Sequence, residues 1–259
     1  MHILISNDDG YSAPGIEALA REMGRFGRVT VVAPEHNHSG SSNALTLNKP
    51  LTVSKAADNV YVVSGTPSDC VHMALTGLIG ERPDLVVSGI NCGANMGDDT
   101  MYSGTVAAAI EGYIFGIDSI AFSQTDKGWG ELESAARVAG IIVERFVSRK
   151  SPETPAVLLN VNIPNMPFEA LQGIKATRLG RRHQAENVIN EINPRGMPIY
   201  WLGAAGKPRD ASPGTDFHAT QHGCVSVTPL QIDLTDHALI ASTQDWIKND
   251  RGPLQSSML

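Results

Sequence analysis

The sequence predicts an α/β protein with a Rossmann-like, doubly wound and mostly parallel sheet, followed by a C-terminal β-hairpin extension. Short apolar runs, typical of buried parallel strands, recur through the first 164 residues. Stretches with helical periodicity separate these runs, and strands that alternate with helices imply parallel pairing with right-handed crossovers. A change of composition after Pro164 predicts the extension.

The first part of the chain supplies three expected strands and two expected helices. The strands are residues 3–5, 29–34 and 60–63, and a helix is expected over residues 16–23. The second helix, from about residue 67, has the clearest start. Thr66 can cap it, Pro67 suits its first position, and Asp69 can reach back to the cap.

The next part continues the alternation. Strands are expected over residues 83–90, 119–123 and 156–163. An alanine-rich helix is expected from residue 103 to about residue 112. A further helix is predicted by apolar residues that fall on one helical face: Leu132, Ala135, Ala139, Ile142, Val143 and Phe146.

Beyond Pro164 the chain becomes rich in proline and glycine, and no clear helix is expected until about Asp236. Three short strands are expected here, at residues 174–179, 199–201 and 223–229. The sequence therefore divides into a Rossmann-like core (1–164), a hairpin-rich arm expected to serve in oligomerisation (165–235) and a C-terminal helix with a tail (236–259). Projecting arms often pair with another subunit. The alternative is an irregular edge of the core domain, and the sequence leaves both open.

Composition excludes several classes of protein. A formal net charge of −7 argues against non-specific nucleic-acid binding. No stretch has the apolar length of a membrane span, and the N-terminus lacks the pattern of a signal peptide. The three cysteines are odd in number and far apart, which favours core thiols in a reduced, cytoplasmic protein over disulfides or metal ligands.

Two adjacent carboxylates, Asp8 and Asp9, follow the first strand. In open α/β sheets, ligands bind at the carboxyl ends of the strands. Two neighbouring negative charges repel unless a cation or a proton compensates, and a divalent cation that prefers oxygen ligands is the natural compensator. The pair therefore predicts a metal site. The alternative is a pair of caps for the helix that follows.

Other polar groups follow neighbouring strands. The second strand leads to Ser39 and Asn43, and the strand ending at Ile90 leads to Asn91 and Asn95. Their hydroxyl and amide oxygens could complete a metal's oxygen shell. Residues 103–105, Ser-Gly-Thr, open a helix, and the free N–H groups of a helix start can bind phosphate. Taken singly, these residues also fit an N-cap or turns.

These motifs together resemble the SurE family, the stationary-phase survival protein and nucleotidase. The resemblance extends over nearly the whole chain. It is carried by Ser6-Asn7-Asp8-Asp9-Gly10, Ala13-Pro14-Gly15-Ile16, Val32-Ala33-Pro34, Ser39-Gly40 with Ser42-Asn43, Gly65-Thr66-Pro67, Asp69-Cys70-Val71, Val87-Ser88-Gly89-Ile90-Asn91, Gly97-Asp98-Asp99, Tyr102-Ser103-Gly104-Thr105-Val106 and Gly214-Thr215-Asp216-Phe217.

The resemblance implies a metal-dependent phosphatase that hydrolyses nucleoside monophosphates at the 5′ or the 3′ position, with activity on some polyphosphates. It implies one divalent metal ion, Mg²⁺ or Mn²⁺, and a homodimer or homotetramer that uses the C-terminal arm. The implied metal ligands are Asp8, Asp9, Ser39 and Asn91. The implied substrate-binding residues are Ser39, Asn43, Asn95, Ser103, Gly104 and Thr105.

One departure from the family's pattern concerns His36 and His38, which stand where the family commonly carries arginine. Protonated histidines could still hold a phosphate. A His-x-His metal site is the minor alternative, because other metal ligands are expected nearby.

The expected mechanism makes Asp8 and Asp9 the catalytic carboxylates, with Asp8 orienting or deprotonating the attacking water. Two other classes remain open. One is a phosphatase with an aspartyl nucleophile. Such enzymes typically carry an Asp-x-Asp motif, whereas this chain has Asn7-Asp8-Asp9, and their remote lysine is not apparent here. The other is a non-catalytic nucleotide sensor that uses the same crevice.

Overall fold

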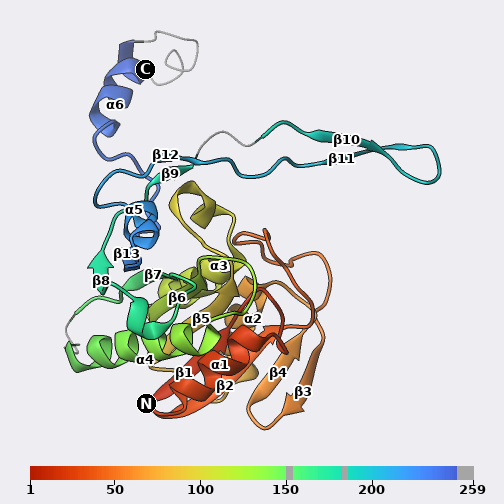
Figure 1. The fold of residues 1–259 in the computed structure, drawn as a ribbon, viewed down its shortest axis with the longest axis vertical. Coiled ribbons are helices and arrows are strands. Elements are labelled where there is room, and N and C mark those ends of the chain that lie inside the picture. The colour runs from red at the N-terminus through yellow and green to blue at the C-terminus, as the bar shows by residue number, and fades with distance from the viewer. Residues whose placement is uncertain (150–153, 183–185, 250–259) are drawn as a thin grey trace, which may run out of the picture.

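The computed structural model describes residues 1–149, 154–182 and 186–249 (Figure 1). Its centre is a nine-stranded sheet. In order across the sheet, the strands are β3 (Val53–Ala57), β4 (Val60–Val63), β2 (Arg28–Pro34), β1 (His2–Ser6), β5 (Leu85–Cys92), β6 (Asp118–Gln124), β7 (Leu158–Ile163), β13 (Val225–Pro229) and β8 (Ile174–Ala176).

The six strands from β4 to β7 pair in parallel, which confirms the predicted doubly wound α/β sheet. Both edges are mixed, because β3 is antiparallel to β4 and β13 is antiparallel to β7. Strand β3 was not predicted from the sequence. All five of its residues are exposed, so no buried face produces an apolar pattern.

Helices cover both faces of the sheet (Figure 1). Helices α1 (Pro14–Met23) and α4 (Leu132–Arg149) bury side chains in one core, with Leu19 of α1 and Ala139 of α4 fully inside. Helices α2 (Pro67–Met73) and α3 (Gly104–Ile114) pack on the other face, where Val71 and Ala108 join Leu4 of β1. The sheet is therefore shielded on both sides, as parallel sheets require.

The predicted start of α2 is confirmed. Thr66 accepts a hydrogen bond from the Asp69 amide at 3.1 Å, and the Asp69 carboxylate accepts one from the Thr66 amide at 2.9 Å. This is a complete capping box. The helix continues into a π-helical turn, η1 (Ala74–Leu78).

Residues 165–235 contribute to the main sheet and also extend beyond it. Strands β13 and β8 lengthen the sheet. The hairpin of β10 (Ile189–Ile192) and β11 (Pro198–Trp201) projects far from the body (Figure 1). At its base, β9 (Arg181–Arg182) pairs with β12 (Pro208–Asp210). The three-part division of the chain stays a prediction.

The expectation of no helix between Pro164 and Asp236 is wrong. Helix α5 (Asp216–Gln221) lies there, capped by Thr215, besides the short turn η3 (Phe168–Ala170). Six residues are fewer than two helical turns, too short to show a periodicity. The expected last helix is present as α6 (Ile240–Asn249), and the tail from residue 250 lies outside the described residues.

In the described part of the chain, none of the helices combines the length and apolar character needed to span a membrane.

Candidate active site

The predicted site lies at the point in the sheet where the order of the strands reverses. Strand β1 stands between β2 and β5, so the connections that leave β1 and β5 run to opposite sides. This is the switch point at which α/β sheets open a ligand crevice. Asp8 and Asp9 follow β1, and Asn91 lies at the end of β5.

Asp8 is the centre of the site. Its side chain is buried, and its carboxylate accepts a hydrogen bond from the Thr105 hydroxyl of α3. A Cβ added at Gly104 would stand 2.7 Å from the Asp8 Cβ and 3.0 Å from its Oδ2. The predicted metal-binding carboxylate and the predicted phosphate-binding helix start are therefore in direct contact.

Both carboxylates resist ionisation in the metal-free protein. The pKa of Asp8 is raised to about 6, mainly by burial; the Thr105 hydroxyl opposes this rise, and the charge of Asp9 contributes to it. Burial also raises the pKa of Asp9, while the Cys92 amide and the Asn37 side chain, each donating at 3.1 Å, oppose the rise. The described residues place no Lys, Arg or His in an ion pair with either carboxylate, so the negative charge here is uncompensated.

This pKa predicts how stability depends on pH. Between the ordinary value of 3.8 and about 6, folded Asp8 keeps a proton that the unfolded chain has released. The free energy of unfolding of the metal-free protein should therefore fall as pH rises through this window, by about 3 kcal/mol for this group. Urea unfolding in chelator from pH 4 to pH 8 measures it, and Asp8→Asn should lack this component. Equal pH dependence in both proteins would contradict the assignment.

The loop after β2 is tied to the site at both of its ends. Asn37 accepts a hydrogen bond from the Ser39 amide at 2.9 Å while its Nδ2 reaches Asp9. Ser42 donates from its amide to the Tyr102 carbonyl at 3.1 Å and from its hydroxyl to the Met101 carbonyl at 2.7 Å. Ser39 and Asn43 are exposed on this loop, beside residues anchored to the crevice.

The two predicted asparagines differ in their surroundings. Asn91 is half-buried, and its Nδ2 donates to the Gly93 carbonyl at 2.8 Å, which orients the amide. Asn95 is buried, its Nδ2 donates to the Ser123 hydroxyl at 2.8 Å, and its backbone carbonyl accepts from Asn160 and Asn162. Asn95 thus fastens its segment to β6 and β7, and its contact with phosphate stays a prediction.

The start of α3 has the expected form. Ser103 is the N-cap, and its hydroxyl accepts a hydrogen bond from the Val106 amide at 3.1 Å. Gly104 is the first helical residue, and the first amides of a helix have no acceptor within it. Thr105 directs its hydroxyl to Asp8. The three residues therefore have separate tasks: a cap, an open amide and a carboxylate contact.

Sequence reasoning missed two residues of the site. Asn37 orders the loop beneath Asp9, and the signal for it was an asparagine two residues before Ser39, as in Asx turns. Ser41 has a buried hydroxyl that no group in the described part of the chain hydrogen-bonds, 3.0 Å from where a Gly104 Cβ would stand. No local pattern marks Ser41, because its surroundings come from α3.

The two histidines of this loop differ in their exposure and in their contacts. The His36 side chain is exposed and lies 4.0 Å from Glu35, whereas His38 is half-buried and its amide donates to the Asp8 carbonyl at 2.7 Å. In the described part of the chain, no group of three or more His, Cys, Asp or Glu side chains is arranged to hold a metal ion.

The residues present fit a divalent cation of the Mg²⁺ or Mn²⁺ type. The donors offered after β1, after β2 and at the end of β5 are oxygens: two carboxylates with no ion-pair partner in the described residues, the hydroxyl of Ser39 and the amide oxygen of Asn91. Hard cations prefer this donor set. A dipositive ion would also offset the raised carboxyl pKa values, because a nearby positive charge favours the ionised carboxylates.

Two comparisons with known proteins bear on this site. The family model described as "Survival protein SurE" matches residues 3–186. The chain belongs to the SurE family. It is also similar to the crystal structure of the SurE protein from Aquifex aeolicus, with 44% sequence identity and a TM-score of 0.84. That match covers 95% of this chain and 100% of the other.

Membership of the SurE family confirms the resemblance read from the motifs. The family is one of phosphatases and nucleotidases, so hydrolysis of phosphate esters is the general activity that the match supports. The matched range includes every predicted site residue from Asp8 to Thr105.

Proposed function

We propose that this protein is a metal-dependent phosphomonoesterase that hydrolyses nucleoside monophosphates to nucleoside and phosphate. Nucleoside 5′-monophosphates are the principal substrates proposed, which makes it a 5′-nucleotidase. The 3′-monophosphates and polyphosphate are further candidates. The observation that carries the proposal is the contact between the buried Asp8 carboxylate and the start of α3 at Gly104 and Thr105.

This contact supports the proposed need for a cation. A helix start attracts phosphate through its free amides and its positive dipole end. A phosphate at Gly104 would face the Asp8 carboxylate across a short gap, and the two negative charges would repel. When bound, a divalent cation supplies the Lewis acidity that offsets this repulsion and makes a water nucleophile available near neutral pH. Asp8, Asp9, Ser39 and Asn91 are the residues proposed to hold it.

The chain's own groups divide the remaining work. The amides at Gly104 and Thr105 would stabilise negative charge on the phosphoryl oxygens, because fixed donors need no reorganisation during reaction. Asp8 would orient the attacking water and take its proton, with the Thr105 hydroxyl fixing one carboxylate oxygen. Ser39, Asn43, Asn95 and Ser103 complete the proposed substrate contacts.

The proposal is tested by measuring phosphate release from a panel of nucleotides. The panel contains 5′- and 3′-monophosphates of each base and inorganic polyphosphate. Each is assayed with chelator, and again after addition of Mg²⁺ or Mn²⁺. We expect release from monophosphates only when metal is present. Binding of nucleotides without any release would favour the sensor, and full release in chelator would exclude a metal-dependent reaction.

We propose that the protein acts in the cytoplasm as a homodimer or homotetramer. Cys70, Cys92 and Cys224 are all free thiols, which fits a reducing compartment. The projecting hairpin exposes large apolar side chains, among them Ile192, Tyr200 and Trp201. Exposed apolar surface of this kind marks interaction sites.

Deleting the tip of the hairpin, residues 190–199, with a short glycine linker in its place, should lower the mass of the assembly. The hairpin projects away from the core, so the deletion should leave the sheet intact (Figure 1). Light scattering measures the mass, and circular dichroism checks the fold. A deletion variant with unchanged mass would show that the tip takes no part in assembly.

A further inference from the structure

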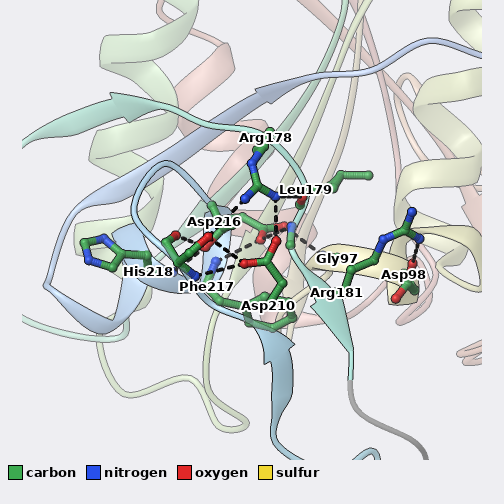
Figure 2. Close-up of polar contacts among 12 residues, drawn as sticks. Gly97, Asp98, Arg178, Leu179, Arg181, Asp210, Asp216, Phe217 and His218 are labelled. Atoms are coloured by element: carbon green, nitrogen blue, oxygen red, sulfur yellow. Dashed lines mark hydrogen bonds and ion pairs between the residues drawn. The ribbon is translucent and has the colours of Figure 1, made fainter.

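Two motifs that the proposed function does not use meet at one buried carboxylate. Asp216 is fully buried, and it begins α5 in the extension. Its Oδ2 accepts a hydrogen bond from the Gly97 amide at 2.7 Å, across 119 residues of sequence. Its Oδ1 accepts from the amides of Gly180 and Phe217, each at 2.8 Å (Figure 2). One carboxylate oxygen thus accepts a hydrogen bond from the core, and the other accepts two from the extension.

A pair of arginines reinforces this junction. The Arg182 guanidinium donates from Nε to the Asp99 carboxylate at 2.8 Å and contacts it again through Nη2. The Arg182 amide and the Arg181 side chain bind the two oxygens of Asp98, at 3.0 and 2.6 Å. Arg182 also lies over the Phe217 ring, 5.1 Å from its centroid.

Gly97 is required at the junction for two reasons. Its φ of +55° lies in the left-handed region that favours glycine. A Cβ there would also stand 2.7 Å from the Phe217 ring and 3.1 Å from the Gly180 carbonyl. The extension therefore packs directly onto the backbone of the core segment.

The segment held in this way leads into the proposed phosphate site. Gly97 begins the 3-10 turn η2 (Gly97–Met101), which is followed by Tyr102 and by Ser103, the N-cap of α3. Before the turn, Asn95 is fastened to the sheet. After it, Thr105 contacts Asp8. Through its hydrogen bond to Gly97, Asp216 thus attaches the extension to the segment that leads from Asn95 to the start of α3 beside Asp8.

We propose that Asp216 is a positioning residue of the active site. Through the Gly97 amide it would set where η2 ends, and so where the open amides of α3 lie relative to Asp8 and Asp9. This inference rests on the proposed phosphatase function. It assigns part of the active-site geometry to the C-terminal extension, which contains none of the predicted catalytic or binding residues.

Asp216→Asn separates the two halves of this contact. An amide that keeps its oxygen toward Gly180 and Phe217 must turn its NH₂ group toward the Gly97 N–H, which sets two donors face to face. The bond to the core is then lost, while the volume of the side chain is conserved.

Asp210→Asn is the matched control. Asp210 lies in the same extension, where its carboxylate accepts from Arg178 at 2.8 Å and from the Ser212 amide at 3.0 Å, and both of these partners belong to the extension (Figure 2). The same substitution there removes an equal charge without touching Gly97.

The experiment compares wild type, Asp216→Asn and Asp210→Asn by amide hydrogen exchange and by steady-state kinetics. We expect exchange over residues 97–101 to become faster in Asp216→Asn only. We also expect kcat to fall about 10- to 100-fold in that variant, with a much smaller change in KM, because misplacement of a binding group costs the transition state most. Asp210→Asn should match wild type in both measurements.

Unchanged exchange over residues 97–101 in Asp216→Asn would overturn the proposal, as would equal losses of kcat in the two variants. If Asp216→Asn does not fold, Asp99→Asn removes the partner of Arg182 from the core side and should also speed this exchange; unchanged exchange would again overturn the proposal. If the wild type releases no phosphate from any nucleotide, the proposed function fails. The exchange comparison still decides whether Asp216 holds the segment.

Discussion

Asp8→Asn should abolish turnover while leaving the fold intact. The amide keeps the shape of the side chain but removes a charge and the proposed proton acceptor. Because Asp8 lies against Gly104 and Thr105, this single change acts on metal binding and on water activation together. We expect kcat/KM for a nucleoside monophosphate to fall by about 10²–10⁴-fold or more. Asp118→Asn is the control, since Asp118 is equally buried but begins β6, so it lies at the amino ends of the parallel strands and not at the carboxyl ends where Asp8 lies.

The same variant should respond differently to metal. A ligand that binds only the folded state stabilises it by mass action, by about 2.7 kcal/mol at a concentration 100 times its Kd. Mg²⁺ or Mn²⁺ should therefore raise the Tm of the wild type and of Asp118→Asn. The increase in the Tm of Asp8→Asn should be much smaller. Near-normal turnover in folded Asp8→Asn would exclude the assigned role.

Trapping separates water attack from attack by Asp8 itself, because Asp8→Asn is inactive in both mechanisms. Water attack forms no covalent phosphoenzyme. Rapid-quench mass spectrometry of the wild type during turnover should find Asp8 unmodified. An aspartyl-phosphate at Asp8 would establish the nucleophilic mechanism instead.

Gly104→Ala should lower kcat/KM by about 10²–10³-fold, the cost of losing a preorganised donor to the transferring group. From the sequence, Gly104 is expected to lie at a helix start that binds phosphate. The structure adds that even a methyl group there would meet Asp8 and the Ser41 hydroxyl, at 2.7–3.0 Å. The substitution should therefore displace the carboxylate as well as obstruct the phosphate. Alanine favours helix more than glycine, so the fold should tolerate it.

Gly80→Ala is the matched control for this variant, because nothing lies within 4 Å of a Cβ built there. Kinetics with a nucleoside monophosphate and inhibition by inorganic phosphate measure both proteins. Phosphate should inhibit Gly104→Ala more weakly than wild type. A folded Gly104→Ala protein with normal kinetics and normal phosphate inhibition would refute the assignment of α3 as the phosphate site.

The sequence by itself determined the features that depend on neighbouring residues. The capping box of Thr66 and Asp69, the Ser103 cap of α3 and the buried strands of the parallel sheet all follow from patterns a few residues long. The polar motifs were sufficient to reveal the resemblance to the SurE family, because their residues and their order match the family's pattern over nearly the whole chain. Where the local signal is weak, as in the exposed strand β3 and the six-residue helix α5, sequence reasoning missed the element.

Only the tertiary structure decided which of these groups touch. Thr105 contacts Asp8 across 97 residues, and Asp216 holds Gly97 across 119. The burial that raises the pKa of Asp8, and the neighbours that confine Gly104, come from segments remote in sequence. Such contacts depend on how whole helices and strands pack, and packing is a property of the assembled core that no short sequence pattern carries.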